Sequence, residues 1–218
     1  GGIILFLNTL FLNFFDNLFL LFLLIIFLIG LFADLQKFNS PKKRLLIQSL
    51  TIFLFVIYND LLIRSIRIPF IDNYLSINLI SFIFTSFCFL ILINGSNFID
   101  GANLQCSGYF FSVITILIYL NFTIINVEYI GFILPLNIFL VCFIFFNFFN
   151  KSYLGDGGSY MLSFLLGYIL IKFHLDTNVS PYFVVLMLWY PAFENLFSII
   201  RRIFNKNLSP DNPDILHL

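Results

Sequence analysis

Charged side chains are scarce in this sequence. Only 10% of its 218 residues are Asp, Glu, Lys or Arg, whereas 61% are hydrophobic, and a typical soluble domain carries roughly 25% charged residues. Together with a mean hydropathy of +1.02, this composition excludes an ordinary soluble domain and indicates a membrane protein. The 11 basic and 11 acidic residues cancel, so no excess of positive charge points to nucleic acid as a partner.

Cysteine and methionine are also rare. Cys88, Cys106 and Cys142 lie in or beside apolar runs without CxxC spacing, which leaves a metal-binding cage or a disulfide framework unsupported. The chain begins with glycine, its only methionines are Met161 and Met187, and no basic segment with a cleavage site precedes the first apolar run. We therefore expect this sequence to be a fragment of a longer chain, cut at both ends and inactive by itself.

Long apolar runs occupy most of the sequence. A bilayer core about 30 Å thick needs roughly 20 helical residues, and Asp16-Asn17 divides the first long run into two. The polar stretches between the runs are too short to fold alone. We predict an all-α fold, in which residues 1–218 form a single transmembrane domain, a polytopic helical bundle. About eight spans are expected, near residues 2–15, 18–33, 44–58, 76–93, 106–121, 129–148, 159–173 and 181–200.

Basic residues are distributed unevenly between the two sides of such a bundle. Because each span takes the chain to the opposite side, one face should collect residue 1, the loops 34–43, 94–105 and 149–158, and the tail after residue 200. That face carries most of the basic residues: Lys37, Lys42, Lys43, Arg44, Lys151, Arg201, Arg202 and Lys206. The other face carries Arg64, Arg67 and Lys172. The positive-inside rule then predicts that the first face is cytoplasmic.

The longest loop on the other face covers residues 59–75, NDLLIRSIRIPFIDNYL. The spacing of its apolar residues fits both an interfacial helix and a short hairpin, with Pro69 ending either one. The sequence does not decide between these alternatives.

Three aspartates stand in polar islands on the predicted cytoplasmic face. Asp34 ends an apolar helix, where the helix dipole disfavours a carboxylate by up to about 1 kcal/mol unless a cation lies nearby. Asp100 lies in NGSNFIDGANLQ (94–105), and Asp156 lies in KSYLGDGGSYML (151–162). Each has a simpler interpretation: Asp34 as a solvated residue partnered by Lys37, and Asp100 and Asp156 as helix N-caps.

The neighbours of these aspartates favour a functional interpretation. Asn97 and Asn103 surround Asp100 with amide oxygens, which together with carboxylates are the ligands that hard cations require. Gly157 stands at a predicted helix start, where free backbone N–H groups attract a phosphate and the missing side chain lets it approach. Lys151 precedes that element. Metal-assisted transfer of a phosphate-bearing substrate needs such a combination on one membrane face.

The C-terminal stretch FENLFSIIRRIFNKNLSPDNPDILHL contributes further basic groups. Arg201 and Arg202 follow the last predicted span, where a basic pair is either a topology anchor or a phosphate-binding pair. His217 is the penultimate residue.

In order along the chain, GGI (1–3), the loop ending in Asp34 with SPKKRLLIQ, NGSNFIDGANL, KSYLGDGGS and the FENLFSIIRR…PDILHL tail resemble the polyprenyl-phosphate N-acetylhexosamine-1-phosphate transferases. These integral membrane enzymes, of the glycosyltransferase family 4 type, start the assembly of cell-wall, O-antigen and related glycans. The tail is similar to that of the branch that initiates surface polysaccharides, such as lipopolysaccharide O-antigen.

The resemblance implies roles for particular residues. Asp34 matches the second member of the family's paired aspartates, Asn97 and Asp100 match its NxxD element, and Asp156 matches the aspartate that binds magnesium in the family. Asn103 stands where many relatives have another aspartate, and His217 matches the first histidine of an HxH element. One departure is serious, since Ala33 occupies the place of the first paired aspartate and can neither accept a proton nor bind a cation.

The reaction implied is transfer of an N-acetylhexosamine 1-phosphate from a UDP-sugar to polyprenyl (undecaprenyl) phosphate, releasing UMP, at a bacterial-type inner membrane. Asp156, helped by Asp100, would hold Mg²⁺, with Mn²⁺ as an alternative, and Asp34 would deprotonate or orient the acceptor. Asn97 and Asn103 would orient the site. Substrate phosphates would be bound by Lys151, Gly157, Arg201, Arg202 and His217.

Two rival functions remain open at this stage. A polytopic transporter is one, although its charges would be expected at the bilayer midplane. A catalytically impaired relative that only binds lipid phosphate is the other, and it is motivated by Ala33. Assembly into a homodimer is also left open.

Overall fold

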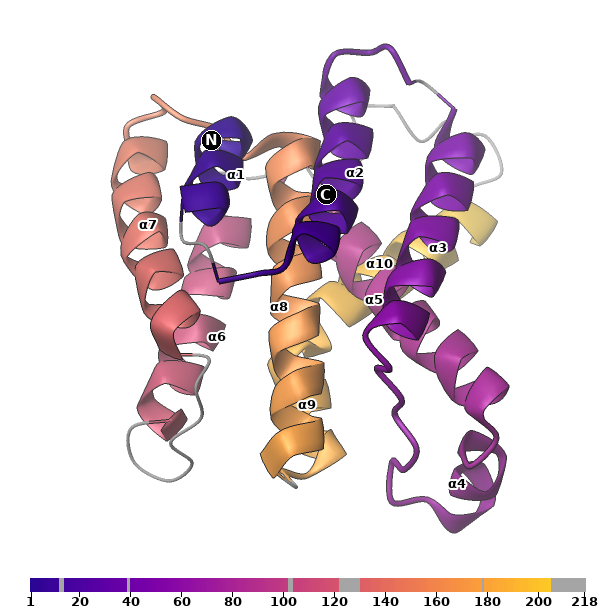
Figure 1. Ribbon diagram of the computed structural model, residues 1–218. Coiled ribbons are helices and arrows are strands. Elements are labelled where there is room, and N and C mark those ends of the chain that lie inside the picture. Colours follow the sequence, from indigo (N-terminus) through magenta and orange to yellow (C-terminus); the bar gives the residue numbers. More distant parts are fainter. Residues whose placement is uncertain (12–13, 39, 102–103, 122–129, 178, 205–218) are drawn as a thin grey trace.

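The chain is all-helical throughout the described residues, as the apolar runs predict. A computed structural model describes residues 1–11, 14–38, 40–101, 104–121, 130–177 and 179–204. Within these ranges the helices, drawn in Figure 1, are α1 (Gly2–Phe11), α2 (Asn17–Asp34), α3 (Pro41–Tyr58), α4 (Pro69–Leu75), α5 (Asn78–Ile99), α6 (Gln105–Leu120), α7 (Ile130–Phe148), α8 (Gly155–Thr177), α9 (Pro181–Met187) and α10 (Trp189–Phe204).

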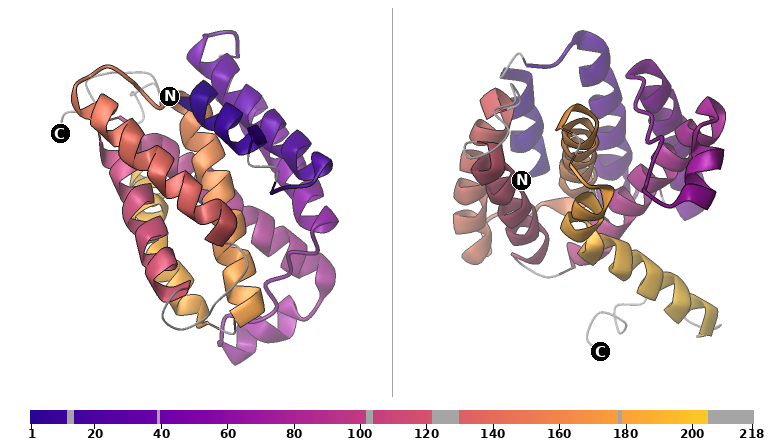
Figure 2. Two further views of the ribbon diagram at one scale, coloured as in Figure 1. Left: turned by 60° about the vertical axis from the view of Figure 1, so that its left-hand side comes forward. Right: turned by 90° about the horizontal axis from the view of Figure 1, so that it is seen from below.

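Helix α8 lies at the centre of the bundle. From residue 157 to residue 171 it is uncharged on all sides, a pattern typical of a helix that is surrounded by protein, and every residue in this range except Tyr168 is buried. It packs most extensively against α2 and α5 and also contacts α1, α6 and α9. Seen from below in Figure 2, α8 stands in the middle of the other helices. Its N-terminal end is therefore reached by several elements at once.

A close backbone contact in this core joins α2 to α8. A Cβ atom added to Gly30 would lie 2.5 Å from the backbone of Asp156 and Gly157, so these two helices touch backbone to backbone. Small residues at such crossings let apolar helices approach closely in membranes. This contact brings the C-terminal end of α2 onto the first turn of α8.

The described residues contain four helices long and apolar enough to cross a membrane, α2, α5, α7 and α8, or five if the bent pair α9–α10 is one span. Eight full spans are not shown. Helix α1 has only 10 residues, and α6 is an apolar helix of 16 residues. Helix α3 has 18 residues, but Lys42, Lys43 and Arg44 occupy its first turn.

The span predicted at 181–200 is not one continuous helix, because α9 and α10 meet at a bend of 66°. Pro191 accounts for the break: a proline ring clashes with the carbonyl four residues earlier, here Met187, so a helix cannot run through both. Proline is accepted in the first turn of a new helix, and α10 starts at Trp189. In Figure 2, α10 runs outward at the edge of the bundle.

The loop at 59–75 is neither a helix nor a hairpin over its LLIRSIRI segment. Residues 61–66 are irregular, and Pro69 begins α4 instead of ending an element. Proline is favoured in the first turn of a helix because its missing N–H has no partner there.

The predicted sharing of one face is confirmed for residue 1 and the three polar loops, whereas most of the tail after residue 200 lies outside the described residues. In Figure 1 the N-terminus, the α2–α3 connection and the α7–α8 connection lie at the same end, opposite α4 and the α8–α9 junction. The α5–α6 connection belongs to the same end, because the backbone N–H of Leu104 donates to the Asn147 side chain of α7 at 2.7 Å. Asn147 in turn donates to the carbonyl of Ser152 in the α7–α8 connection at 2.6 Å.

Candidate functional site

The N-terminal end of α8 is capped by a carboxylate from another helix. Asp34, the last residue of α2, accepts hydrogen bonds from the backbone N–H of Asp156 at 2.9 Å and of Gly157 at 3.2 Å. The first N–H groups of a helix have no partner within it, and a negative charge there is also favoured by the helix dipole. Asp34 thus satisfies two of them from 122 residues away in the sequence.

Gly155, the first residue of α8, receives the second carboxylate. The Gly155 backbone N–H donates to the carboxylate of Asp100, which follows the last residue of α5. Gly155 has φ +71°, and a Cβ atom there would lie 2.7 Å from an oxygen of Asp34. Both the left-handed backbone and the close carboxylate require glycine at this position. Three successive N–H groups of α8 therefore face carboxylates from α2 and the end of α5.

The third aspartate points away from this cap toward α3 and α5. Asp156 accepts from the guanidinium of Arg44 on α3, with the nitrogen and oxygen 3.2 Å apart, and both side chains are partly exposed. Asn97 of α5 donates to the same carboxylate and accepts from the hydroxyl of Ser159 at 3.2 Å. Asp156 is thus held from two sides by helices that the sequence separates widely.

A layer of buried polar side chains lies next to the acidic cluster. Gln48 is completely buried one helical turn after Arg44, and Asn94 donates to its amide oxygen at 3.4 Å. Ser159, also buried, donates to the carbonyl of Asp156 as well as to Asn97. Polar side chains inside an apolar bundle are costly, so they are usually kept for a function. This layer lies at the same end of the bundle as the acidic groups and is therefore counted as part of the candidate site.

The acidic cluster carries an excess of negative charge. Three carboxylates, those of Asp34, Asp100 and Asp156, meet here. The one ion pair that the described residues show for them joins Asp156 to Arg44. Burial, together with the negative charges of Asp156 and Asp34, raises the pKa of Asp100 to about 7, against the opposing hydrogen bond from Gly155. An uncompensated group of this kind is stabilised by a proton or by a cation.

The donor set has the chemistry of a magnesium site, since Mg²⁺ prefers carboxylate and amide oxygens. As they stand, however, the described residues include no group of three His, Cys, Asp or Glu side chains placed to hold an ion. The cause lies in the hydrogen bonds above: Asp34 and Asp100 face backbone N–H groups, and Asp156 faces Arg44. The residue types fit a hard cation, and binding one would require at least Asp156 to exchange its arginine partner.

Comparison with known proteins identifies the family. A model of glycosyl transferase family 4 matches residues 17–174, which is well over half of the chain. The chain belongs to this family. The family membership that the five motifs predicted is therefore confirmed, and the matched region runs from the start of α2 to the last turn of α8.

A curated relative supports the same assignment. The chain is 29% identical over 205 residues to a "Probable undecaprenyl-phosphate N-acetylglucosaminyl 1-phosphate transferase" of Bacillus subtilis (strain 168), an alignment that covers 88% of this chain and 55% of the relative. This family 4 chain thus spans about half the length of the relative it matches.

The structure brings part of the predicted site together. Asp34, Asp100, Asp156, Asn97 and Gly157 meet at the start of α8. The other predicted binding residues are placed as follows: Lys151 lies in the α7–α8 connection and is exposed, Arg201 is exposed near the end of α10, and Asn103, His217 and the side chain of Arg202 lie outside the described residues.

Sequence reasoning missed three contributors to this site. It treated Arg44 as a headgroup anchor and gave no role to Gln48 or Ser159. A signal was available for the first two, because Arg44 and Gln48 are four residues apart and share one face of a helix. A glutamine within an apolar run has no reason to face lipid, which would have directed that face, and Arg44 with it, toward the interior.

Proposed function

We propose that this chain forms the core of an enzyme that transfers an N-acetylhexosamine 1-phosphate from a UDP-sugar to polyprenyl phosphate, with release of UMP. The observation that carries the proposal is the meeting of Asp34, Asp100 and Asp156 at one end of an apolar bundle. The substrate class named for the Bacillus relative supports it.

The location of the cluster suits an amphiphilic acceptor. A polyprenyl phosphate keeps its chain in the hydrocarbon and its phosphate at headgroup depth, which is where helix ends such as those of α2 and α5 lie. An oxygen of the lipid phosphate would attack the sugar-side phosphorus of the UDP-sugar. A new P–O bond forms, the bond from that phosphorus to the oxygen of UMP breaks, and UMP leaves with the electron pair.

The acidic residues would hold Mg²⁺ or Mn²⁺. We expect Asp156 and Asp100 to be its ligands, and the bound cation would neutralise charge on the diphosphate as UMP leaves. Asn97 would keep the Asp156 carboxylate oriented through the hydrogen bond it already donates. Arg44, once exchanged from Asp156, would be free to bind a phosphate oxygen.

Asp34 would orient the site more than it would move a proton. Both of its oxygens already accept N–H groups of α8, and a phosphate monoester with a second pKa near 6 is largely ionised at neutral pH without a base. The remaining predicted groups are proposed to bind substrate phosphates or to orient the site: Asn103, Lys151, Gly157, Arg201, Arg202 and His217.

The cellular setting is part of the proposal. The basic loops favour a cytoplasmic position for the acidic cluster, in a bacterial plasma membrane. The product would start a lipid-linked surface glycan of the cell-wall or O-antigen kind. A transporter is less well supported, because the cluster lies at helix ends and not at the midplane.

The impaired-relative alternative rests on one observation. Ala33 stands beside Asp34 and contributes no carboxylate, so the site has one acidic group fewer than the motif predicts. Under this alternative the chain would bind lipid phosphate without turnover.

The test is an assay with Mg²⁺, labelled UDP-N-acetylglucosamine and undecaprenyl phosphate, with lipid-linked product as the readout. We expect Asp156→Asn and Asp100→Asn to lower the rate by at least about 100-fold, because they lose a ligand charge. Asp60→Asn is the matched control, since Asp60 follows the C-terminal end of α3, whose N-terminal turn carries Arg44, and asparagine tolerates its φ of +49°.

Full activity of Asp156→Asn would overturn the proposal. If the wild type yields no product across a panel of UDP-sugars while Ala33→Asp does, the impaired-relative alternative is correct.

A further inference from the structure

The ion pair between Arg44 and Asp156 occupies the carboxylate that is expected to hold the cation. A guanidinium nitrogen lies 3.2 Å from Oδ2 of Asp156, and Asn97 donates to the same carboxylate. The other two carboxylates of the cluster, those of Asp34 and Asp100, face backbone N–H groups of α8. Each acidic group of the described site therefore already has a partner, and a cation has to displace one of them.

Arg44 is the partner that can leave most easily. Its side chain is 22% exposed and stands in the first turn of α3, whereas the N–H groups that face Asp34 and Asp100 belong to the backbone of α8. A guanidinium has five N–H donors, and Asp156 is the acceptor that the described residues provide for them. Donors therefore remain to bind a phosphate oxygen before the bond to Asp156 breaks.

A divalent cation and the Arg44 guanidinium compete for Oδ2 of Asp156. Both are positive, and two charges that contact the same oxygen lie only a few ångströms apart, where repulsion is strong and a partly buried site is little screened by salt. The Asp156 side chain is 29% exposed, so its surroundings are of this kind. The competition ends when the guanidinium finds another anion.

We propose that this ion pair keeps the cation site of the resting protein closed until the donor arrives: Arg44 leaves Asp156 for the diphosphate of the UDP-sugar and so vacates the carboxylate for the cation. The inference rests on the proposed function, since it needs Asp156 as a cation ligand and a nucleoside diphosphate as the donor. Its consequence is cooperative binding. Because donor and cation each weaken the same ion pair, each raises the affinity of the protein for the other by the same factor.

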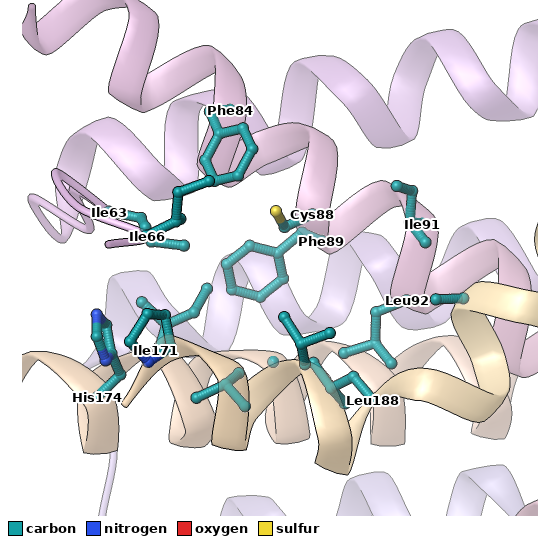
Figure 3. A pocket seen from close by; sticks show the side chains of 15 residues that line it. Ile63, Ile66, Phe84, Cys88, Phe89, Ile91, Leu92, Ile171, His174 and Leu188 are labelled. Atoms are coloured by element: carbon teal, nitrogen blue, oxygen red, sulfur yellow. The ribbon is translucent and has the colours of Figure 1, made fainter. Parts of the chain in front are cut away.

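Binding of Mg²⁺ reports on this site because the described cavities elsewhere do not suit a divalent cation. An apolar cavity of about 260 Å³ lies between α5, α8 and α9, and Figure 3 shows its lining, in which His174 and Cys88 are the titratable side chains among apolar ones. A second cavity, of about 480 Å³, is lined by the carboxylate of Asp60 beside Arg64 and Arg67. Neither offers the pair of carboxylates that the acidic cluster provides.

The first test compares Mg²⁺ affinities by calorimetry, on the purified chain without substrate. We expect R44Q to bind Mg²⁺ about tenfold more tightly than the wild type, because one charge-assisted hydrogen bond no longer has to be broken. Lys43→Gln is the matched control, since it removes the same charge from the neighbouring exposed position of α3. Its Mg²⁺ affinity should stay within about twofold of the wild type, because salt screens an exposed charge.

UDP, which carries the diphosphate of the donor, tests the second half of the proposal. Saturating UDP should raise the Mg²⁺ affinity of the wild type by a factor about ten times larger than the corresponding factor for R44Q. The reason is that UDP removes the competing guanidinium from the wild type, whereas R44Q has none to remove. The rest of the increase is common to both proteins, because the phosphates of UDP bind Mg²⁺ directly.

Chemical modification of the wild type measures the same step without a variant, so it applies even if R44Q does not fold. Phenylglyoxal reacts with accessible guanidinium groups, and mass spectrometry gives the extent of reaction at each arginine. Saturating Mg²⁺ should raise the reaction at Arg44 by releasing it from Asp156, and addition of UDP should lower it again. Arg64, which is exposed in the irregular segment before α4, serves as the internal reference.

Equal Mg²⁺ affinities of R44Q and Lys43→Gln would rule out the proposal, and so would a reaction at Arg44 that saturating Mg²⁺ leaves unchanged. The proposed function would survive either result. Asp156→Asn distinguishes the two failures. If it binds Mg²⁺ as tightly as the wild type does, Asp156 is not the cation ligand, and the ion-pair proposal fails together with the metal part of the proposed function.

Discussion

The cap that Asp34 places on α8 makes a quantitative prediction about stability. Asp34→Ala removes the acceptor for two backbone N–H groups, at 2.9 and 3.2 Å. Charge-assisted hydrogen bonds contribute about 1.5–3 kcal/mol each when buried, but Asp34 is exposed and the lower value of about 1 kcal/mol applies to each. The total of about 2 kcal/mol also matches the upper range for loss of an N-cap.

For a chain of this length, about 2 kcal/mol corresponds to a decrease in Tm of roughly 4–8 °C. Thermal unfolding in detergent, followed by circular dichroism, measures it. Asp34→Asn keeps one acceptor oxygen and should lose about half as much. Asp176→Ala is the matched control, because it removes the same charge from the last turn of α8, where the helix dipole disfavours a carboxylate.

Wild-type Tm values for both Asp34 variants would refute the reasoning. They would mean that Asp34 does not stabilise α8, and a complete loss of activity in both would then favour a role as a base.

Three further outcomes are expected. Gly155→Ala should lower the free energy of unfolding by about 1–3 kcal/mol, because residue 155 has a φ of +71°. Gly108→Ala is the control: it lies in a helix with nothing near the added carbon, so thermal unfolding should show an unchanged or higher Tm. Gly95→Ala would place a methyl carbon against the carbonyl oxygen of Pro191, so the free energy of unfolding should fall by at least about 1–3 kcal/mol in the same assay. An unchanged Tm would contradict the close crossing of α5 and α10. The pKa of Asp100 is raised to about 7 and that of Asp156 to about 6, so between about pH 6 and pH 7 a single proton competes with the cation. Mg²⁺ affinity measured by calorimetry should therefore rise about tenfold over this range and then level off, and an affinity independent of pH between about 6 and 8 would contradict this.

The sequence predicted the face on which the site lies because that prediction depends only on how often the chain crosses. Apolar run lengths indicate the crossings, and each crossing reverses the side. Asp34, Asp100 and Asp156 therefore had to share one end, although eight full spans are not shown in the described residues. Short helices such as α1 and α6 reverse the chain direction as long ones do, so the parity was right even where the span was not shown.

The role of each aspartate could not be predicted in the same way. The sequence suggested N-caps for Asp100 and Asp156 within their own segments, but the structure caps α8 with Asp34 and Asp100 from elsewhere, and Asp156 pairs with Arg44. Such contacts depend on how closely α2 and α8 approach at Gly30. The distance between two packed helices depends on the side chains of both, so it leaves no periodic pattern in the sequence of either one.

The bend between α9 and α10 was missed for a different reason. Its signal, Pro191, is present in the sequence, but the apolar run continues on both sides of it and a count of hydrophobic residues does not register a single proline. The position of a proline relative to the carbonyl four residues earlier is the physical quantity that matters.

The backbone contact between Gly30 and Gly157 bears on how this chain can diverge. Buried apolar residues of α2, such as Phe19 and Leu23, should accept only side chains of similar volume. At Gly30 a methyl group would lie 2.5 Å from the backbone of α8, whereas at Gly157 it would make a tight contact of 3.2 Å with the backbone nitrogen of Leu31. Sequencing the survivors of a library of random variants should therefore show glycine kept at position 30, while exposed positions of α2 such as Leu21 vary.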